Sequence, residues 1–154
     1  MEIEKKYLIK ELPDGLDQFP CEEIEQGYLC DNPTLRIRRK GNRFVFTYKG
    51  RVESEERLCV ADEVERPLTR EAYEHLRLKV DGILIEKTRY RIPFGDYEIE
   101  LDVFHGIHNG LLLAEVEFPT VEEAKEFIPP EWFGEDVSGD VKYTNSYLSE
   151  NSVK

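Results

Sequence analysis

Residues 97–104 read YEIELDVF, and this stretch decides the fold class. From Tyr97 to Val103, apolar and acidic side chains alternate at every position. Successive side chains of a β-strand point to opposite faces of the sheet, so the pattern predicts a strand with one apolar face and one face of carboxylates. The preceding pair Gly95-Asp96 is a hairpin signal, and we therefore expect the strand before it to run antiparallel.

Seven more segments show period-2 patterning or are enriched in β-branched and aromatic residues. They are residues 2–9, 22–30, 34–40, 43–49, 57–65, 83–92 and 112–118. Two helices are predicted, one over 69–79 and one from Thr120 until Pro129-Pro130 stops it. The tail over 132–148 is expected to add a last helical turn. These elements predict an α+β protein that is mostly antiparallel β-sheet.

The polar faces of several strands carry charges of a single sign. The basic pairs are Arg36 with Arg38 and Lys87 with Arg89, and the acidic pairs are Glu63 with Glu65 and Glu115 with Glu117. Parity alone favours a sheet packed on helices with its charged face in water, because such sheets are common. Segregation of the signs by strand favours a closed eight-stranded barrel with the charges inside, since a solvated face would more often mix them.

A closed barrel would turn the charged faces into the lining of a lumen. Carboxylates on adjacent strands are costly to bury unpaired, so they would recruit hard divalent cations. Arginine and lysine on the facing strands would bind non-bridging phosphate oxygens. Acidic and basic groups in one dry channel are what phosphoryl transfer needs.

The composition of the 154-residue chain is that of one soluble domain, residues 1–154, with a net charge of −12. Nucleic acid is therefore not an expected partner, because non-specific affinity for it comes from a basic surface. No apolar run is long enough for a membrane span, and no signal peptide is visible. Three cysteines without CxxC spacing predict reduced thiols and a cytoplasmic protein.

A series of short motifs in a fixed order resembles the CYTH, or triphosphate tunnel metalloenzyme, family. The series begins with Glu2-x-Glu4-x-Lys6, which is similar to the family's ExExK signature. The motifs that follow are Gln26-Gly27-Tyr28-Leu29, Arg36-x-Arg38, Thr47-x-Lys49, Glu63-x-Glu65, Lys87-x-Arg89, Asp102-Val103-Phe104-x-Gly106, Glu115-x-Glu117, Asp136-Val137-Ser138 and Tyr143-x-Asn145. Ser138 stands where the family more usually has threonine. The resemblance covers essentially the whole chain.

The resemblance implies an eight-stranded tunnel with helices outside, acting on a triphosphate with Mg2+ or Mn2+. By motif position, the metal-binding carboxylates would be Glu2, Glu4, Glu115 and Glu117, which with Lys6 form the catalytic set. The phosphate-binding bases would be Lys6, Arg36, Arg38, Lys49, Lys87 and Arg89. Acidic tunnel positions with less defined roles would be Glu63, Glu65, Glu100 and Asp102.

Within this family we expect hydrolysis of inorganic tripolyphosphate to diphosphate and phosphate. The chain is short, which leaves little beyond the tunnel to recognise a nucleoside or a thiamine ring. The enzymatic alternatives are a class IV-type adenylate cyclase and a thiamine triphosphatase, and the non-enzymatic one is a polyphosphate-binding module. We expect a monomer or a homodimer.

Three other polar residues can be placed by their surroundings. Tyr28 shares a strand face with Gln26, so its hydroxyl either reaches the tunnel and adjusts chain-length preference or only packs at the rim. His105 and His108 lie in a glycine-flanked loop, where exposed histidines are expected rather than a metal site.

Overall fold

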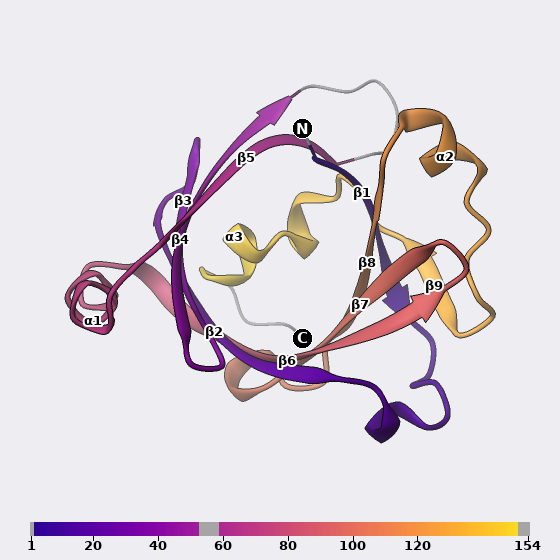
Figure 1. The fold of residues 1–154 in the computed structure, drawn as a ribbon, viewed down its shortest axis with the longest axis horizontal. Helices are drawn as coiled ribbons and strands as arrows, with labels where there is room; N and C mark the ends of the chain where they lie inside the picture. The colour runs from indigo at the N-terminus through magenta and orange to yellow at the C-terminus, as the bar shows by residue number, and fades with distance from the viewer. Residues whose placement is uncertain (1, 53–58, 151–154) are drawn as a thin grey trace.

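The computed structural model describes residues 2–52 and 59–150, and within them nine strands form one antiparallel sheet. Its strands are β1 (Glu2–Ile9), β2 (Cys21–Cys30), β3 (Thr34–Lys40), β4 (Arg43–Val52), β5 (Cys59–Pro67), β6 (Asp81–Phe94), β7 (Tyr97–Phe104), β8 (Leu112–Phe118) and β9 (Phe133–Asp136). The order is β5-β4-β3-β2-β6-β7-β8-β1-β9, and β5 also pairs with β1. This last pairing joins the ends of the eight-strand ring, which Figure 1 shows end-on.

The predicted strands are confirmed within one to three residues at most boundaries. Residues 57 and 58 of the strand expected over 57–65 lie outside the described part of the chain. The sequence did not predict β9, a four-residue strand without alternation. Tertiary contacts explain it, because the Phe133 ring packs 4.8 Å from the Tyr7 ring and Ile9 pairs with Phe133.

Two predicted helices lie on opposite sides of the ring (Figure 1). The Thr69 side chain caps helix α1 (Arg70–Arg77), and Tyr73 anchors the helix through a 2.8 Å hydrogen bond to Glu25 on the outer face of β2. Helix α2 (Val121–Glu126) is capped by Thr120 and ends well before Pro129-Pro130. Both caps agree with the sequence, whereas α1 ends two residues earlier than expected.

The larger apolar core lies outside the barrel. It is enclosed between the outer faces of β1, β6, β7 and β8 on one side and helix α2 with strand β9 on the other. Its buried members are Tyr7, Ile92, Ile99, Leu101, Ala114, Val116, Phe118, Ala124 and Phe133. The apolar face of the 97–104 stretch therefore points outward and its carboxylates point inward. No helix within the described residues is long and apolar enough to cross a membrane.

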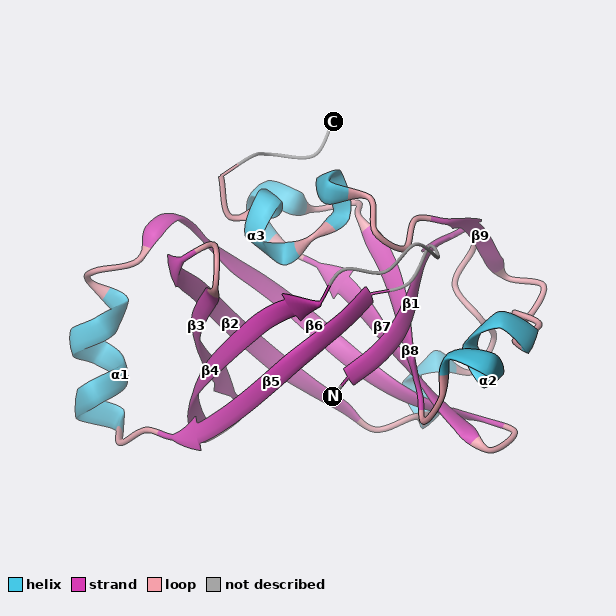
Figure 2. Ribbon diagram, turned by 90° about the horizontal axis from the view of Figure 1, so that it is seen from above, coloured by secondary structure: helices cyan, strands magenta, loops and turns pink. Residues whose placement is uncertain are grey.

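A second apolar cluster fills one end of the barrel, beneath the short helix α3 (Asn145–Leu148). It contains Tyr28, Ile85, Phe104, Leu111, Leu113, Val137 and Leu148. The C-terminal segment is tied down by the Lys6 backbone N–H, which donates to the Ser138 hydroxyl at 2.8 Å. Figure 2 shows α3 lying across this end of the barrel. The expected last helical turn is therefore present, as a cover over one mouth.

Replacing Leu148 with alanine should lower the free energy of unfolding by about 2–5 kcal/mol, because Leu148 is fully buried and its loss leaves a cavity. Urea denaturation followed by circular dichroism measures the change. Val141→Ala is the matched control, since Val141 is 57% exposed on the same segment and should change stability little. An equal, small effect of both substitutions would mean that Leu148 does not anchor the cover.

Candidate active site

The charged residues singled out in the sequence converge inside the barrel. Their ion pairs cross strands that are not neighbours, since Lys49 on β4 contacts Glu2 on β1 and Arg38 on β3 contacts Glu65 on β5. Such contacts place these side chains on one face of the sheet, and the pairing of β5 with β1 closes that face into a lumen. An open, solvated sheet is therefore the wrong alternative. The residues gathered here are Glu2, Glu4, Lys6, Arg36, Arg38, Lys49, Glu63, Glu65, Lys87, Arg89, Glu100, Asp102, Glu115 and Glu117.

The acidic wall of the lumen contains two pairs of carboxyl groups in hydrogen-bond contact, Glu2 with Glu63 and Glu4 with Glu115. Burial, reinforced by the charge of Glu115, raises the pKa of Glu4 well above its usual value. Burial and Glu2 likewise raise the pKa of Glu63 to about 7. One member of each pair therefore tends to keep its proton, because two carboxylates in contact repel each other.

Lys49 partly neutralises this wall. Its Nζ lies 2.7 Å from Glu2 Oε1 and 3.6 Å from Glu4 Oε1. Burial alone would lower the pKa of Lys49, but the charges of Glu4 and Glu2 outweigh it and raise the pKa. Glu117 lies opposite Glu4 in the register at the exposed side of the wall, and burial together with Glu2 and Glu100 raises its pKa. The wall thus holds more carboxyl groups than its lysine can balance.

The facing basic wall is organised around Asp102. Arg89 donates to both Asp102 carboxylate oxygens, at 2.8 and 2.9 Å, and Lys87 Nζ lies 2.8 Å from Asp102. Burial would raise the pKa of Asp102, but Arg89 and Lys87 outweigh it and the pKa is lowered. Two cations share one carboxylate here, so the cluster keeps a net positive charge, with Glu100 at 3.6 Å from Arg89 as a more exposed counter-charge.

Arg36 and Arg38 extend the basic wall along β3. Arg38 donates to Glu65 at 2.7 Å, and Arg36 lies 3.5 Å from Glu63. The Nε atoms of both arginines are buried and have no hydrogen-bond partner among the described residues. Buried N–H groups without an acceptor are costly, so both guanidiniums have donors available for an anionic ligand.

The C-terminal segment that covers one end of the barrel also contacts side chains of the lumen, through Tyr143 and Asn145. Lys6 Nζ donates to the Tyr143 carbonyl oxygen at 2.9 Å and lies 3.8 Å from Glu115, while Lys87 Nζ is 3.5 Å from Asn145 Oδ1. Reasoning from strand parity missed these contacts, although the Tyr143-x-Asn145 motif signalled the segment. Lys142 is exposed and adds no cation to the lumen.

The acidic wall fits a hard divalent cation in its chemistry, because carboxylate oxygens are the ligands that Mg2+ and Mn2+ prefer. No group of three or more His, Cys, Asp or Glu side chains converges on a single ion position within residues 2–52 and 59–150. The carboxyl groups meet in pairs instead. This arrangement suits Mg2+, which is commonly held by one or two carboxylates and completes its shell with water and phosphate oxygens.

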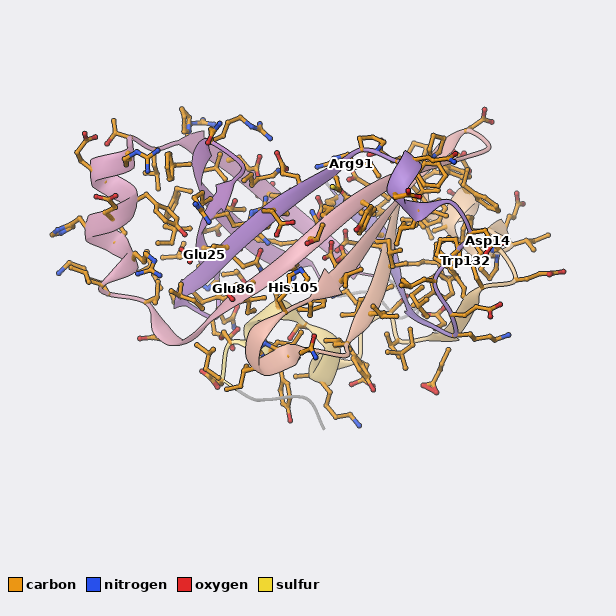
Figure 3. All side chains as sticks on the ribbon, turned by 90° about the horizontal axis from the view of Figure 1, so that it is seen from below. Asp14, Glu25, Glu86, Arg91, His105 and Trp132 are labelled. Carbon is orange, nitrogen blue, oxygen red and sulfur yellow. The ribbon has the colours of Figure 1, made fainter. Side chains whose placement is uncertain are left out.

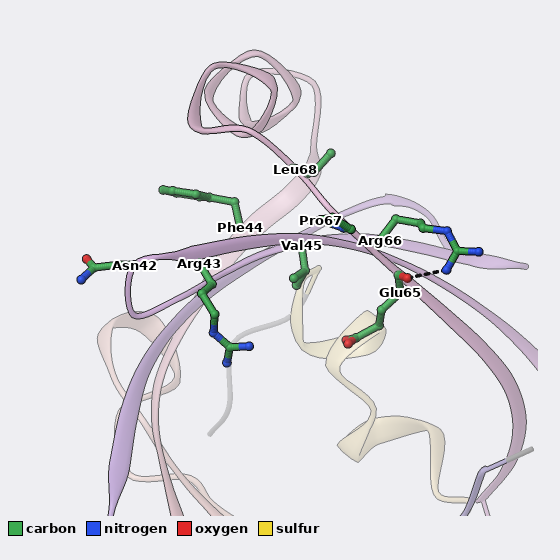
Figure 4. Close-up of a pocket in the computed structure, with 8 residues that line it drawn as sticks. All are labelled: Asn42, Arg43, Phe44, Val45, Glu65, Arg66, Pro67 and Leu68. Carbon is green, nitrogen blue, oxygen red and sulfur yellow. Dashed lines mark hydrogen bonds between the residues drawn. The ribbon is translucent and has the colours of Figure 1, made fainter.

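A cavity of about 400 Å³ lies at the barrel rim, beside the basic wall. Its lining residues are Asn42, Arg43, Phe44, Val45, Glu65, Arg66, Pro67 and Leu68. In Figure 4, Arg43, Val45 and Glu65 point towards the barrel interior, whereas Phe44 and Leu68 point towards α1. Glu65 thus belongs to both the cavity and the lumen, but the paired carboxyl groups do not line this cavity.

The loop histidines lie outside the lumen, as Figure 3 shows for His105 beside the outer-face residues Glu25 and Glu86. His105 is partly buried, with its Nε2 2.7 Å from the Thr88 hydroxyl. His108 is buried and lies edge-on to Phe104, with ring centroids 6.3 Å apart. The expectation of exposed histidines was therefore wrong, since His105 is partly buried and His108 fully buried where the loop folds back onto the barrel end.

Together, the closed ring and its opposed walls define a class of protein with acidic and basic groups gathered inside an antiparallel barrel. The CYTH domain family model matches residues 1–137, and the chain belongs to this family. It is 39% identical over 153 residues to the inorganic triphosphatase of Nitrosomonas europaea, covering 96% of each chain. It is 34% identical over 160 residues to that of Acetivibrio thermocellus, covering 99% of this chain and 96% of the relative.

A solved structure agrees with these relatives. The crystal structure of an inorganic triphosphatase is similar to this one with a TM-score of 0.72 and 35% sequence identity. The similarity covers 100% of this chain and 97% of the other. The barrel and the cover are therefore compared over their full extent.

Proposed function

We propose that this protein hydrolyses inorganic tripolyphosphate to diphosphate and phosphate with the help of Mg2+ or Mn2+. The observation that carries the proposal is that one lumen holds an acidic wall, with its contacting carboxyl groups, and a basic wall, where the Nε donors of two arginines have no partner among the described residues. Relatives named inorganic triphosphatases, alike over almost the whole chain, support this substrate.

The basic wall would hold the substrate. Phosphate oxygens accept from Lys6, Arg36, Arg38, Lys49, Lys87 and Arg89. The guanidiniums are suited to bidentate contacts with two oxygens, and the lysines act as point charges. The same cations stabilise the charge that develops on the departing diphosphate when the terminal phosphoryl group is attacked.

The acidic wall would hold the cation. Glu2, Glu4, Glu115 and Glu117 are the proposed ligands, and Glu63, Glu65, Glu100 and Asp102 set the charge around the ligands and bases. A bound divalent cation supplies a water of lowered pKa and neutralises phosphate charge. The carboxyl groups must release their shared protons to bind it, which Lys49 favours by its positive charge.

The test is phosphate release from tripolyphosphate, diphosphate, ATP and thiamine triphosphate, each with Mg2+, Mn2+ or EDTA. We expect release from tripolyphosphate that depends on the metal and is absent in EDTA. Formation of cyclic AMP from ATP would replace the proposal with a cyclase, and faster release from thiamine triphosphate would change the substrate. Binding of tripolyphosphate without any release would leave a polyphosphate-binding module.

Raising the pH through about 8 should raise the KM for tripolyphosphate. Burial lowers the pKa of Lys87 to about 8, although Asp102 acts against it, so Lys87 loses its charge above this pH. In Lys87→Arg the guanidinium stays charged, and KM should stay nearly constant across this range. Lys49→Arg is the control and should keep the parent's pH dependence, because the pKa of Lys49 is raised. Unchanged pH dependence in Lys87→Arg would assign the effect to another group.

We further propose that residues 1–154 act as one catalytic domain in the cytoplasm, as a monomer or a homodimer. The thiols of Cys21 and Cys30 are free, which suits a reducing compartment. Size-exclusion chromatography with light scattering distinguishes the two oligomeric states.

A further inference from the structure

Gln26 is a fully buried amide in the wall of the lumen. It lies on β2, where the register places it opposite Arg38 of β3 and Ile85 of β6, and its exposed fraction is 0%. Arg38 beside it is charged, yet Gln26 has no charge to contribute to anion binding. A buried polar group of this kind needs a reason in the contacts that it makes.

The NH2 end of the Gln26 amide forms a hydrogen bond with Tyr28. Gln26 Nε2 donates to the Tyr28 hydroxyl oxygen at 3.2 Å. Because that oxygen accepts, the hydroxyl proton must point elsewhere, and the hydroxyl donates to no atom of the described residues. Tyr28 is only 4% exposed, so bulk water does not readily take up this proton.

The other end of the amide explains its orientation. Gln26 Oε1 is buried and accepts no hydrogen bond from the described part of the chain. The register places Arg38 opposite Gln26 and Arg36 opposite Tyr28. Positive guanidiniums stabilise the oxygen end of an amide dipole and oppose its N–H end, which favours the amide with its N–H groups towards Tyr28.

Three donors in this wall therefore find no acceptor within residues 2–52 and 59–150: the Tyr28 hydroxyl and the Nε–H groups of Arg36 and Arg38. A phosphoryl group offers several acceptor oxygens and fits such a set. Tyr28 also belongs to the apolar cluster that fills the covered end of the barrel, together with Ile85 and Leu148. Its hydroxyl thus lies where the polar part of the lumen ends.

We propose that Gln26 is a positioning residue. It orients the Tyr28 hydroxyl so that this hydroxyl donates a hydrogen bond to an oxygen of the substrate's terminal phosphoryl group. The inference rests on the proposed function, because it needs a phosphate chain in the lumen. It deepens that function by adding a neutral hydrogen-bond donor to the site, at the end of the lumen that the apolar cluster fills.

Substitutions at Gln26 test the direction of the hydrogen bond. In Gln26→Glu, the carboxylate accepts the Tyr28 proton and withdraws it from the substrate, so affinity for tripolyphosphate should fall roughly 10- to 100-fold. Gln26→Met keeps the volume but frees the hydroxyl, and Tyr28→Phe removes it; each should weaken binding by about tenfold. If Gln26 acts through Tyr28, the double variant Gln26→Met/Tyr28→Phe should bind no more weakly than Tyr28→Phe alone.

Calorimetric titration of tripolyphosphate in EDTA measures these affinities without turnover. KM and kcat are then measured in a separate assay with Mg2+. Gln18→Met, on the exposed surface, is the matched control and should bind like the parent. Thermal melting shows whether each variant folds, and Gln26→Glu supports the argument even if Gln26→Met is unstable. Additive losses in the double variant, or parent-like affinity in Gln26→Glu, would overturn the inference. A parent protein that binds tripolyphosphate but releases no phosphate would refute only the proposed hydrolysis.

Discussion

Replacing Glu4 with glutamine should lower metal-dependent phosphate release by roughly 10²–10³-fold and leave the metal-free fold nearly unchanged. Burial and the facing Glu115 raise the pKa of Glu4 well above its usual value. A neutral amide therefore resembles the protonated acid that exists when no cation is bound. Once a cation is present, the amide cannot supply the anionic oxygen that the acid supplies after losing its proton.

The experiment compares kcat/KM with Mg2+ and the melting temperature in EDTA. Glu86→Gln is the matched control, because Glu86 is exposed on the outer face of β6 and should leave both quantities unchanged. Full metal-dependent turnover in Glu4→Gln would remove Glu4 from the cation site. A large drop in melting temperature in EDTA would show instead that the carboxylate is structural.

Replacing Asp102 with asparagine should destabilise the fold by about 3–5 kcal/mol. The substitution removes the one charge that Arg89 and Lys87 share at 2.8–2.9 Å, and both cations are almost fully buried. Without Asp102 their mutual repulsion and desolvation are no longer offset. The amide keeps the shape of the side chain, so the loss reports charge rather than packing.

Chemical denaturation in EDTA measures this effect. The control is Glu98→Gln, which breaks a 3.2 Å contact with Arg91 at a position where Glu98 is 54% exposed, and it should cost about 0–1 kcal/mol. Tripolyphosphate should restore part of the stability of Asp102→Asn, because it brings negative charge to the same two cations. Equal stability of the two variants would show that the Asp102 cluster is held by other contacts.

The strands could be predicted from the sequence because alternation records which side of a strand is apolar. Closure of the sheet could not be predicted from alternation alone. It depends on the pairing of Glu2 with Ala61 and of Glu4 with Cys59. Nothing in the sequence near these residues indicates that the two strands pair. The segregation of charge by strand favoured closure, and the order of the motifs strengthened it.

The candidate site was predicted for the side chains that share strand faces, and the structure brings these residues into one lumen. Their metal and phosphate contacts remain predictions. The contacts of Lys6 with the Tyr143 carbonyl and of Gln26 with Tyr28 were not predicted. The first involves a backbone atom 137 positions away, which strand parity does not address. For the second, parity placed Gln26 and Tyr28 on one face, but the hydrogen bond between them depends on side-chain conformation.

The position of β1 in the ring has a consequence for how the chain folds. β1 contacts β5, β8 and β9, whose residues follow it by about fifty to one hundred and thirty positions in the sequence. During synthesis from the N-terminus, β5 is made first and pairs only with Glu2–Glu4, so most of β1 must wait for its partner until β8 has been made. Such long-range pairing makes barrel closure a late event, with folding expected on the millisecond-to-second scale. Until then β1 has unpaired edges that another chain could occupy.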